Sequence, residues 1–176
     1  MIITETKLPG AFIIDLERLV DERGFFALGW SAEIFAAQGL NQQLVEINLS
    51  FNRKKGTLRG MHFQTAPHSQ AKLVRCTAGA VYDVFIDLRP ASDTFKQWTA
   101  VELTAENHRQ VYIPEGFAHG FQTLVDGSEV AYQMAAPYNS ESARGVRWND
   151  PAFAIEWPAA ERIIIARDQA YPDFTG

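Results

Sequence analysis

From Lys72 onward the chain is a succession of short apolar segments separated by tight turns, and this pattern most restricts its fold. The segments that we expect to be strands are residues 73–77, 81–88, 98–103, 110–114, 117–124 and 129–135. Asp126-Gly127 and Ala78-Gly79 predict hairpin turns between neighbouring strands. Strands at this spacing, with few helical periods, predict a sandwich or barrel rather than a parallel sheet.

The opening third adds strands over residues 12–14 and 44–52 and one short helix. Ser31 is a suitable N-cap, residues 33–37 form the helix, and Gly39 is a suitable terminator. The 176 residues contain no repeat, low-complexity tract or linker that would divide them. We therefore expect one all-β domain over residues 1–176, with a few short peripheral helices.

Composition excludes several classes of protein. A net charge of −5 is unfavourable for binding nucleic acid through its phosphates alone. No apolar run is long enough to span a membrane, and the N-terminus does not resemble a signal peptide. Cys76 is the single cysteine, reads as a packed core residue, and cannot form a disulfide within the chain. We therefore expect a cytoplasmic protein that binds neither nucleic acid nor membrane.

The stretch Gly56-Thr57-Leu58-Arg59-Gly60-Met61-His62-Phe63-Gln64, followed by Lys72, places three basic groups in a region that otherwise reads as strand. Cationic groups in a partly buried strand are costly unless an anion lies opposite them. One interpretation is that Arg59 and Lys72 point to solvent and that His62 is a hydrogen-bonded core residue. The three together favour a site for an anionic ligand.

Strict alternation along this stretch would put Arg59 and His62 on opposite faces of the strand. Both can reach one ligand only if the strand bulges or bends between them. Gly60 is the natural position for that irregularity.

Two further strands carry polar groups on apolar faces. Tyr132 shares a face with Val130 and Met134, where its hydroxyl needs a partner, and a core tyrosine bonded to the backbone is the alternative to a functional one. His119 lies between Phe117 and Phe121 on one face of its strand, and a lone histidine among aromatic side chains is more often structural than a ligand.

A metal site is not indicated. Small β-barrels of the cupin type commonly bind metal through a His-x-His pair, but the second position is Gln64 in this chain. His68 and His108 lie in polar stretches that read as loops. No glycine fingerprint for a dinucleotide is present, so we expect no cofactor.

Several segments resemble the dTDP-4-dehydrorhamnose 3,5-epimerase family, and the likeness covers nearly the whole chain. The segments are Asp21-Glu22-Arg23-Gly24-Phe25-Phe26, the Gly56 to Gln64 stretch, Lys72-Leu73-Val74-Arg75, Asp83-Val84, Asp87-Leu88-Arg89, Ile113-Pro114-Glu115-Gly116-Phe117-Ala118-His119-Gly120-Phe121 and Trp148-Asn149-Asp150-Pro151. The resemblance implies a cupin jelly-roll barrel, a homodimer, no metal, and a nucleotide-diphosphate sugar with a 4-keto-6-deoxy ring as substrate.

By position, the resemblance implies that His62 is the general base and Tyr132 the acid on the opposite face of the sugar. Asp168 matches the carboxylate that orients the base, and Lys72 matches the cation near the developing enolate. Other positions match substrate-binding residues, and Arg23 and Phe26 match positions contributed across the dimer interface. The expected substrate-binding residues are Arg23, Phe26, Glu46, Asn48, Arg59, His119 and Tyr138.

Three positions depart from the family pattern. Leu28 and Glu46 replace a Glu and a Gln that face the nucleotide base, and Ala143 or Arg144 replaces a further Glu. The Glu46 carboxylate accepts hydrogen bonds from thymine N3–H or from an amino group of cytosine or guanine equally well. Three alternatives therefore stay open: a CDP- or GDP-linked substrate, inversion of one carbon only, and a cupin that binds a sugar nucleotide without turning it over.

Overall fold

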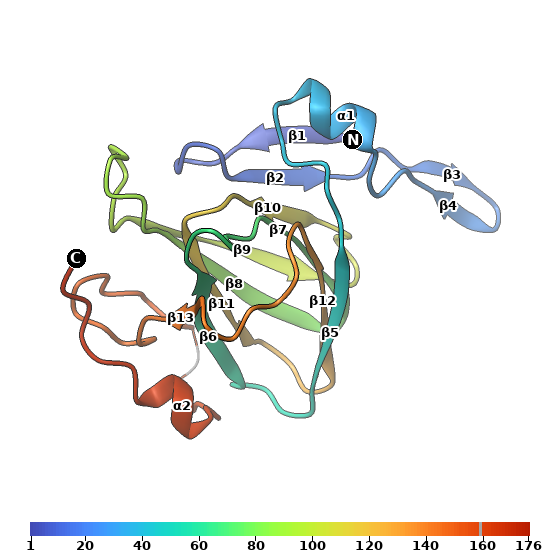
Figure 1. The fold of residues 1–176 in the computed structure, drawn as a ribbon. Coiled ribbons are helices and arrows are strands. Elements are labelled where there is room, and N and C mark those ends of the chain that lie inside the picture. Colours follow the sequence, from blue (N-terminus) through green and yellow to red (C-terminus); the bar gives the residue numbers. More distant parts are fainter. Residues whose placement is uncertain (159) are drawn as a thin grey trace.

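Two antiparallel sheets face each other in the computed structural model, which describes residues 1–158 and 160–176 (Figure 1). One sheet has six strands in the order β1-β2-β10-β7-β12-β5, and the other has five in the order β13-β6-β11-β8-β9. β3 and β4 form a separate two-stranded hairpin. The prediction of an all-β jelly-roll barrel with short peripheral helices is confirmed.

Each predicted strand and the predicted helix agree with an observed element within a few residues, and the structure adds elements at residues 2–5, 19–21, 24–26, 143–145 and 166–169 that were not predicted. In chain order they are β1 (Ile2–Glu5), β2 (Phe12–Asp15), β3 (Leu19–Asp21), β4 (Gly24–Phe26), α1 (Ala32–Ala37), β5 (Glu46–Asn52), β6 (Leu58–Gln64), β7 (Lys72–Ala78), β8 (Ala80–Asp87), β9 (Trp98–Thr104), β10 (Gln110–Ile113), β11 (Phe117–Thr123), β12 (Ser128–Met134), β13 (Ala143–Gly145) and α2 (Ala166–Gln169). No helix in this described part of the chain is long and apolar enough to cross a membrane.

The two predicted hairpins are wrong. Ala78-Gly79 joins β7 to β8, and Asp126-Gly127 lies between β11 and β12, yet in both cases the two strands belong to different sheets. Gly79 and Gly127 do adopt the left-handed conformation that such turns require, with φ of 70° and 68°. At both places the chain therefore turns and continues in the opposite sheet. The residues of a turn alone do not show which strands pair with each other.

The helix prediction is confirmed at both ends of α1. The Ser31 hydroxyl accepts a hydrogen bond from the Ile34 amide at 3.4 Å, which satisfies one unpaired amide of the first turn. Gly39 follows the helix at φ 70°, where a side chain would be strained. Phe35 is buried and packs edge-on against Tyr112 of β10, which fixes α1 on the outer side of the six-stranded sheet.

The main core lies between the two sheets. Val74 of β7 and Val130 of β12 contribute from the six-stranded sheet, and Phe85 of β8 and Phe121 of β11 contribute from the other. All four are at most 1% exposed. Burial of these apolar side chains is the main stabilising term for the sandwich and holds the facing strands in register.

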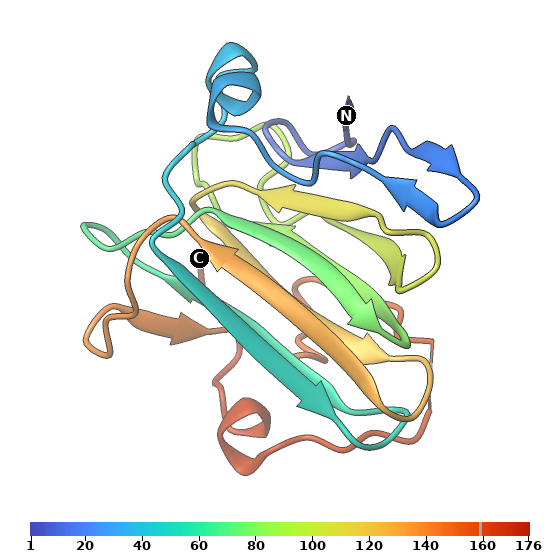
Figure 2. The same cartoon turned by 90° about the vertical axis from the view of Figure 1, so that its right-hand side faces the viewer.

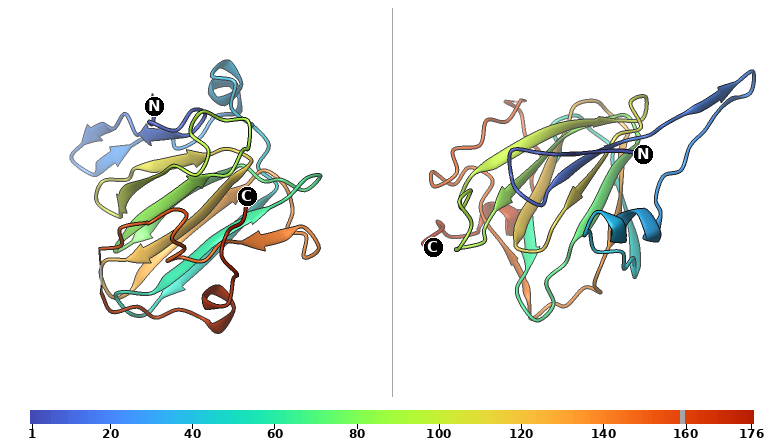
Figure 3. Two further views of the ribbon diagram at one scale, coloured as in Figure 1. Left: turned by 90° about the vertical axis from the view of Figure 1, so that its left-hand side faces the viewer. Right: turned by 90° about the horizontal axis from the view of Figure 1, so that it is seen from above.

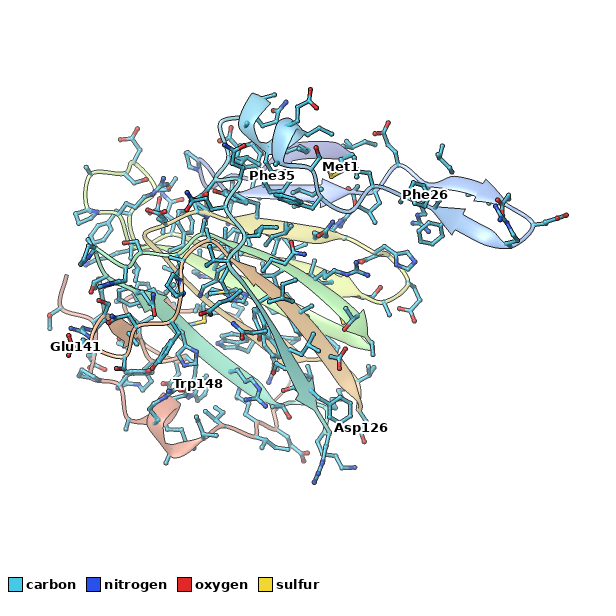
Figure 4. The ribbon with its side chains drawn as sticks, turned by 45° about the vertical axis from the view of Figure 1, so that its right-hand side comes forward. Met1, Phe26, Phe35, Asp126, Glu141 and Trp148 are labelled. Carbon is cyan, nitrogen blue, oxygen red and sulfur yellow. The ribbon has the colours of Figure 1, made fainter. Side chains whose placement is uncertain are left out.

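Two apolar surfaces remain uncovered. β5 is an edge strand that lies beside β12 in Figure 2, and Ile47, Leu49 and Phe51 on its outer face are 57–67% exposed. The β3–β4 hairpin projects far from the body in the right-hand view of Figure 3. Phe26, labelled at its base in Figure 4, is 72% exposed.

Candidate active site

A cavity of about 530 Å³ opens between the two sheets and is large enough for a sugar nucleotide fragment. Its walls come from β5, β6, β7, β11, β12, β13, α2 and the chain just before α2. The predicted site residues that line it are Asn48, Arg59, His62, Lys72, His119, Tyr132, Tyr138 and Asp168. Residues more than 100 positions apart in the sequence are thus brought together.

His62 and Asp168 form a hydrogen-bonded pair at one wall. His62 Nε2 lies 2.8 Å from Asp168 Oδ1, and the Gly60 amide donates to Asp168 Oδ2 at 3.2 Å. Burial alone would raise the pKa of the Asp168 carboxyl. The hydrogen bond from His62, its positive charge and the hydrogen bond from the Gly60 amide outweigh burial, so the pKa is lowered. An ionised Asp168 keeps the proton on Nε2 and leaves Nδ1 as the basic nitrogen.

A bulge in β6 directs His62 into the cavity. His119 of β11 pairs with His62, whereas Phe121 pairs with Arg59. Two residues of β6, Gly60 and Met61, therefore lie opposite the single residue Gly120 of β11. Gly60 lies in this irregularity at φ 132°. The predicted bulge at Gly60 is confirmed, and it allows Arg59 and His62 to line one cavity.

Lys72 projects into the cavity from β7 and is only 8% exposed. Its ammonium donates to the His62 carbonyl at 3.1 Å, which leaves two donors for other partners. Burial lowers the pKa of Lys72 to about 8, while the negative charge of Asp83 opposes this shift. The group is therefore a buried cation at neutral pH with spare donors.

Tyr132 enters from β12, on the sheet opposite His62. Its ring packs against Phe121 at 6.3 Å between centroids and edge-on against His119 at 5.9 Å. Burial, and then the charge of Asp83, raise the pKa of the Tyr132 phenol, which keeps it protonated at neutral pH. Ser50 of β5 lies close enough to moderate this rise, although its buried Oγ meets no partner at full hydrogen-bond geometry among the residues that the structure describes.

His119 and Asp83 form a second imidazole–carboxylate pair. His119 Nε2 lies 2.8 Å from Asp83 Oδ2, and the two side chains are 4% and 0% exposed. Burial lowers the pKa of His119, and the charge of Asp83 opposes this only in part. His119 therefore lines the cavity as a neutral imidazole whose Nε2 is held by Asp83.

The remaining predicted residues lie toward the mouth of the cavity. Arg59 is exposed, and its Nε donates to Asn52 at 2.8 Å. Tyr138 is 64% exposed on the loop after β12, and its amide donates to Glu46 Oε1 at 3.3 Å. Glu46 thus supports the Tyr138 loop from the rim without lining the cavity.

Arg23 and Phe26 lie away from the cavity, on the projecting β3–β4 hairpin. The Arg23 side chain is 84% exposed and bonds Asp21 at 2.5 Å. Neither residue lines the cavity of its own chain. Their contact with a nucleotide stays a prediction, and the hairpin does not make it in the cavity of its own chain.

The structure adds three residues to which the sequence assigned no role. Arg167 lies beside the base, with Nη2 3.3 Å from His62 Nε2, and Tyr171 packs edge-on against the His62 ring. Asp83 bonds His119. A carboxylate between the apolar residues of β8 was the available signal for Asp83, whereas Arg167 and Tyr171 had no signal beyond their nearness in sequence to Asp168, which was expected in the site.

Metal ligands do not converge in the described structure: residues 1–158 and 160–176 contain no group of three or more His, Cys, Asp or Glu side chains placed to hold an ion. His68 is bonded to Ser142 at 3.0 Å, and His108 lies in the loop before β10 and packs against Phe25.

The family model, the sequence relatives and the solved structures that match this chain all point to one family of epimerases. A family model described as dTDP-4-dehydrorhamnose 3,5-epimerase matches residues 5–176. A dTDP-4-dehydrorhamnose 3,5-epimerase of Salmonella typhimurium is 43% identical over 174 residues, which cover 98% of this chain and 94% of the relative.

Two solved structures have the same fold. The dTDP-4-dehydrorhamnose 3,5-epimerase of Bacillus anthracis, with TDP and PPi bound, is 40% identical and superposes with a TM-score of 0.94 over 98% of each chain. The dTDP-6-deoxy-D-glucose-3,5-epimerase of Legionella pneumophila, in complex with dTDP-4-keto-L-rhamnose, is 38% identical with a TM-score of 0.89 over 96% of this chain and 90% of that one.

Proposed function

The chain belongs to the dTDP-4-dehydrorhamnose 3,5-epimerase family of isomerases, and from this membership we propose that its own site inverts C3 and C5 of a nucleotide-linked 4-keto-6-deoxy sugar. The observation that carries the proposal is that His62 and Tyr132 approach one cavity from opposite sheets. A sugar ring between them would have a base on one face and an acid on the other.

His62 starts each inversion. The ketone at C4 acidifies the hydrogens on C3 and C5, because the electron pair left by proton removal is shared with O4. A neutral imidazole with a reference pKa of about 6.5 is a suitable acceptor near neutrality. Asp168 fixes the tautomer through Nε2 and stabilises the imidazolium that results.

Tyr132 completes each inversion by donating its proton to the carbon from the opposite face. Lys72 supplies the positive charge while O4 carries negative charge, and one well-placed donor of this kind contributes about 3 kcal/mol to transition-state stabilisation. The proton removed and the proton returned leave the oxidation state of the sugar unchanged, so this route requires no redox cofactor.

The nucleotide part of the substrate would occupy the mouth, near Arg59, Asn48 and Tyr138. The solved relatives described above bind TDP or dTDP-4-keto-L-rhamnose, which supports dTDP as the carrier. Glu46 accepts the Tyr138 amide with Oε1, which leaves Oε2 available for a base N–H donor. Calorimetric titration with dTDP, CDP, UDP and GDP tests this, and equal affinities would remove dTDP from the proposal.

A homodimer would complete the site. The exposed apolar face of β5 and the projecting hairpin are surfaces that a second copy can cover. Arg23 and Phe26 would then reach the mouth of the partner's cavity, where a guanidinium and an aromatic ring suit a nucleoside diphosphate. We place this dimer in the cytoplasm, where nucleotide sugars and a reduced, buried Cys76 are both expected.

Deuterium exchange tests the reaction. The dTDP-linked 4-keto-6-deoxy sugar is incubated with the protein in D2O, and label at C3 and C5 is followed by NMR. Label and inverted product at both carbons, abolished by His62→Asn, is the expected result. Label at one carbon alone would indicate a single-centre epimerase, and no label would indicate a protein that only binds the sugar nucleotide.

A further inference from the structure

Asp83 is a buried carboxylate, and only one of its two oxygens has a hydrogen-bond partner among the described residues. It lies on β8, between β11 and β9, and is 0% exposed. Oδ2 bonds His119, but Oδ1 is buried and meets no hydrogen-bond donor among the described residues. A carboxylate in this position is costly unless a positive charge compensates it.

The titratable groups that face Asp83 come from β11, which is adjacent to β8, and from β7 and β12 of the facing sheet. They are Lys72 and Cys76 of β7, His119 of β11 and Tyr132 of β12, each of which feels its charge. Lys72 is the one cation among them at neutral pH. Its own hydrogen bond goes to the His62 carbonyl, so Asp83 attracts it across a gap and not through direct contact.

We propose that Asp83 is a positioning residue for the reaction: its buried carboxylate fixes His119 through Nε2 and is the counter-charge that keeps Lys72 an ammonium in the cavity. Asp83 does not itself line the cavity, so it acts through these two groups. The inference deepens the proposed function and rests on it, since a neutral Lys72 would offer O4 no fixed positive charge.

The strength of this coupling follows from the low polarity of the site. Attraction between unit charges several ångströms apart is several-fold stronger at a buried site than in water. Among the described residues, Asp83 is the one group whose charge raises the pKa of Lys72 against the effect of burial. Without that charge, the remaining effect of burial moves the titration of Lys72 toward or below neutral pH.

The test compares Asp83→Asn with the wild-type protein. The amide oxygen of Asn can still accept from His119 Nε2, so the ring stays in place while the charge is lost. The titration of the Lys72 ammonium is followed by NMR in the free protein, assigned with Lys72→Met. We expect the midpoint to fall by about one pH unit or more, and the alkaline limb of kcat/KM to move by the same amount.

Asp87→Asn is the matched control. Asp87 is a buried carboxylate on the same strand, but it bonds Arg89, Ser92 and Thr94 outside the site. This variant should lose stability and leave the titration of Lys72 and the pH profile unchanged. Asp83→Glu, which keeps the charge, should preserve most of the wild-type titration.

An unchanged Lys72 midpoint in Asp83→Asn would overturn the inference. If that variant does not fold, isotope-edited infrared spectroscopy of the wild-type protein decides, because a protonated Asp83 at pH 7 cannot be a counter-charge. Both measurements need no substrate. Failure of the proposed reaction would therefore be distinguishable. The Lys72 titrations would then follow the expectation, but the wild-type protein would introduce no deuterium into the sugar in D2O.

Discussion

Gly60 and Gly120 lie backbone to backbone where β6 bulges against β11. A Cβ atom on Gly60 would come within 2.5 Å of the Gly120 Cα, closer than real side chains approach. This contact allows β6 to curve, so that His62 faces the cavity while the Gly60 amide reaches Asp168 at 3.2 Å. The orientation of the base thus depends on two residues that have no side chain.

Gly60→Ala should therefore be strongly destabilising. The new Cβ clashes with backbone that cannot move aside, in addition to strain at φ 132°. We expect a loss of at least about 3 kcal/mol in the free energy of unfolding, measured by urea denaturation. Gly24→Ala is the control, because Gly24 has φ 128° and nothing within 4 Å of an added Cβ. A similar loss in both variants would show that backbone strain, and not the clash, accounts for the loss of stability at position 60.

The strands could be predicted from the sequence because alternation of apolar residues is a local property. The bulge at Gly60 was also predictable, since Arg59 and His62 could serve one ligand only if the alternation broke between them. Pairing was not predictable from turns: Asp126-Gly127 has the composition of a hairpin, yet its flanking strands lie in different sheets. The partner of a strand is decided by burial across the whole sandwich, which local chemistry does not encode.

The catalytic positions followed from the resemblance, whereas their environment did not. Neither the burial of Lys72 nor the bond between Asp83 and His119 can be read from spacing, because the residues lie on different strands. Arg167 and Tyr171 are adjacent to His62 only because the C-terminal segment pairs with the start of β6, where the Ile163 carbonyl accepts the Leu58 amide at 3.0 Å. Long-range contacts of this kind become visible only in the folded chain.

Asp168→Asn should separate orientation of the base from substrate binding. The amide can hold the wrong tautomer of His62, so kcat should fall roughly 100- to 1,000-fold, while KM changes by less than about threefold. Steady-state kinetics checks this. A large rise in KM with kcat unchanged would assign Asp168 to binding instead.

The same variant should alter acid stability. The pKa of Asp168 is lowered in the folded protein, so its contribution to stability is present above the unfolded value of about 3.9 and is lost as pH falls through the folded pKa. Asp168→Asn should lack this contribution. Urea midpoints between pH 3 and 7 should therefore fall less steeply on acidification in the variant than in the wild-type protein.

Tyr132→Phe should uncouple proton removal from inversion. His62 remains able to take a proton from C3 or C5 and return a solvent deuteron to the same face. We expect label in recovered substrate at a near wild-type rate, with formation of inverted product reduced at least about 100-fold. NMR of substrate and product in D2O distinguishes the two. Inverted product at an undiminished rate would remove Tyr132 as the acid.

Leu49→Asp should disrupt the proposed dimer. Leu49 is 67% exposed on the outer face of the edge strand β5, and a carboxylate buried there on association would be unpaired. We expect a monomer in size-exclusion chromatography with light scattering, and loss of activity because the partner's hairpin is missing. Ile2→Asp is the control, since Ile2 is 56% exposed on the opposite edge strand, β1. A dimer that survives Leu49→Asp would place the interface elsewhere.

Lys72 should make activity and stability change in opposite directions above pH 8. The reaction needs its ammonium, so kcat/KM should fall as pH rises through about 8, where the buried group loses its proton. Tyr132 cannot cause this limb, because its pKa is raised above the ordinary value of 10.

Stability should rise over the same range, since an unfolded lysine with a pKa near 10.4 still binds the proton that the folded one has released. The slope is at most about 1.4 kcal/mol per pH unit for one proton. Urea unfolding at pH 7.5–9.5 measures it, and Lys72→Met, which has no proton to lose, should show neither the rise in stability nor the alkaline limb.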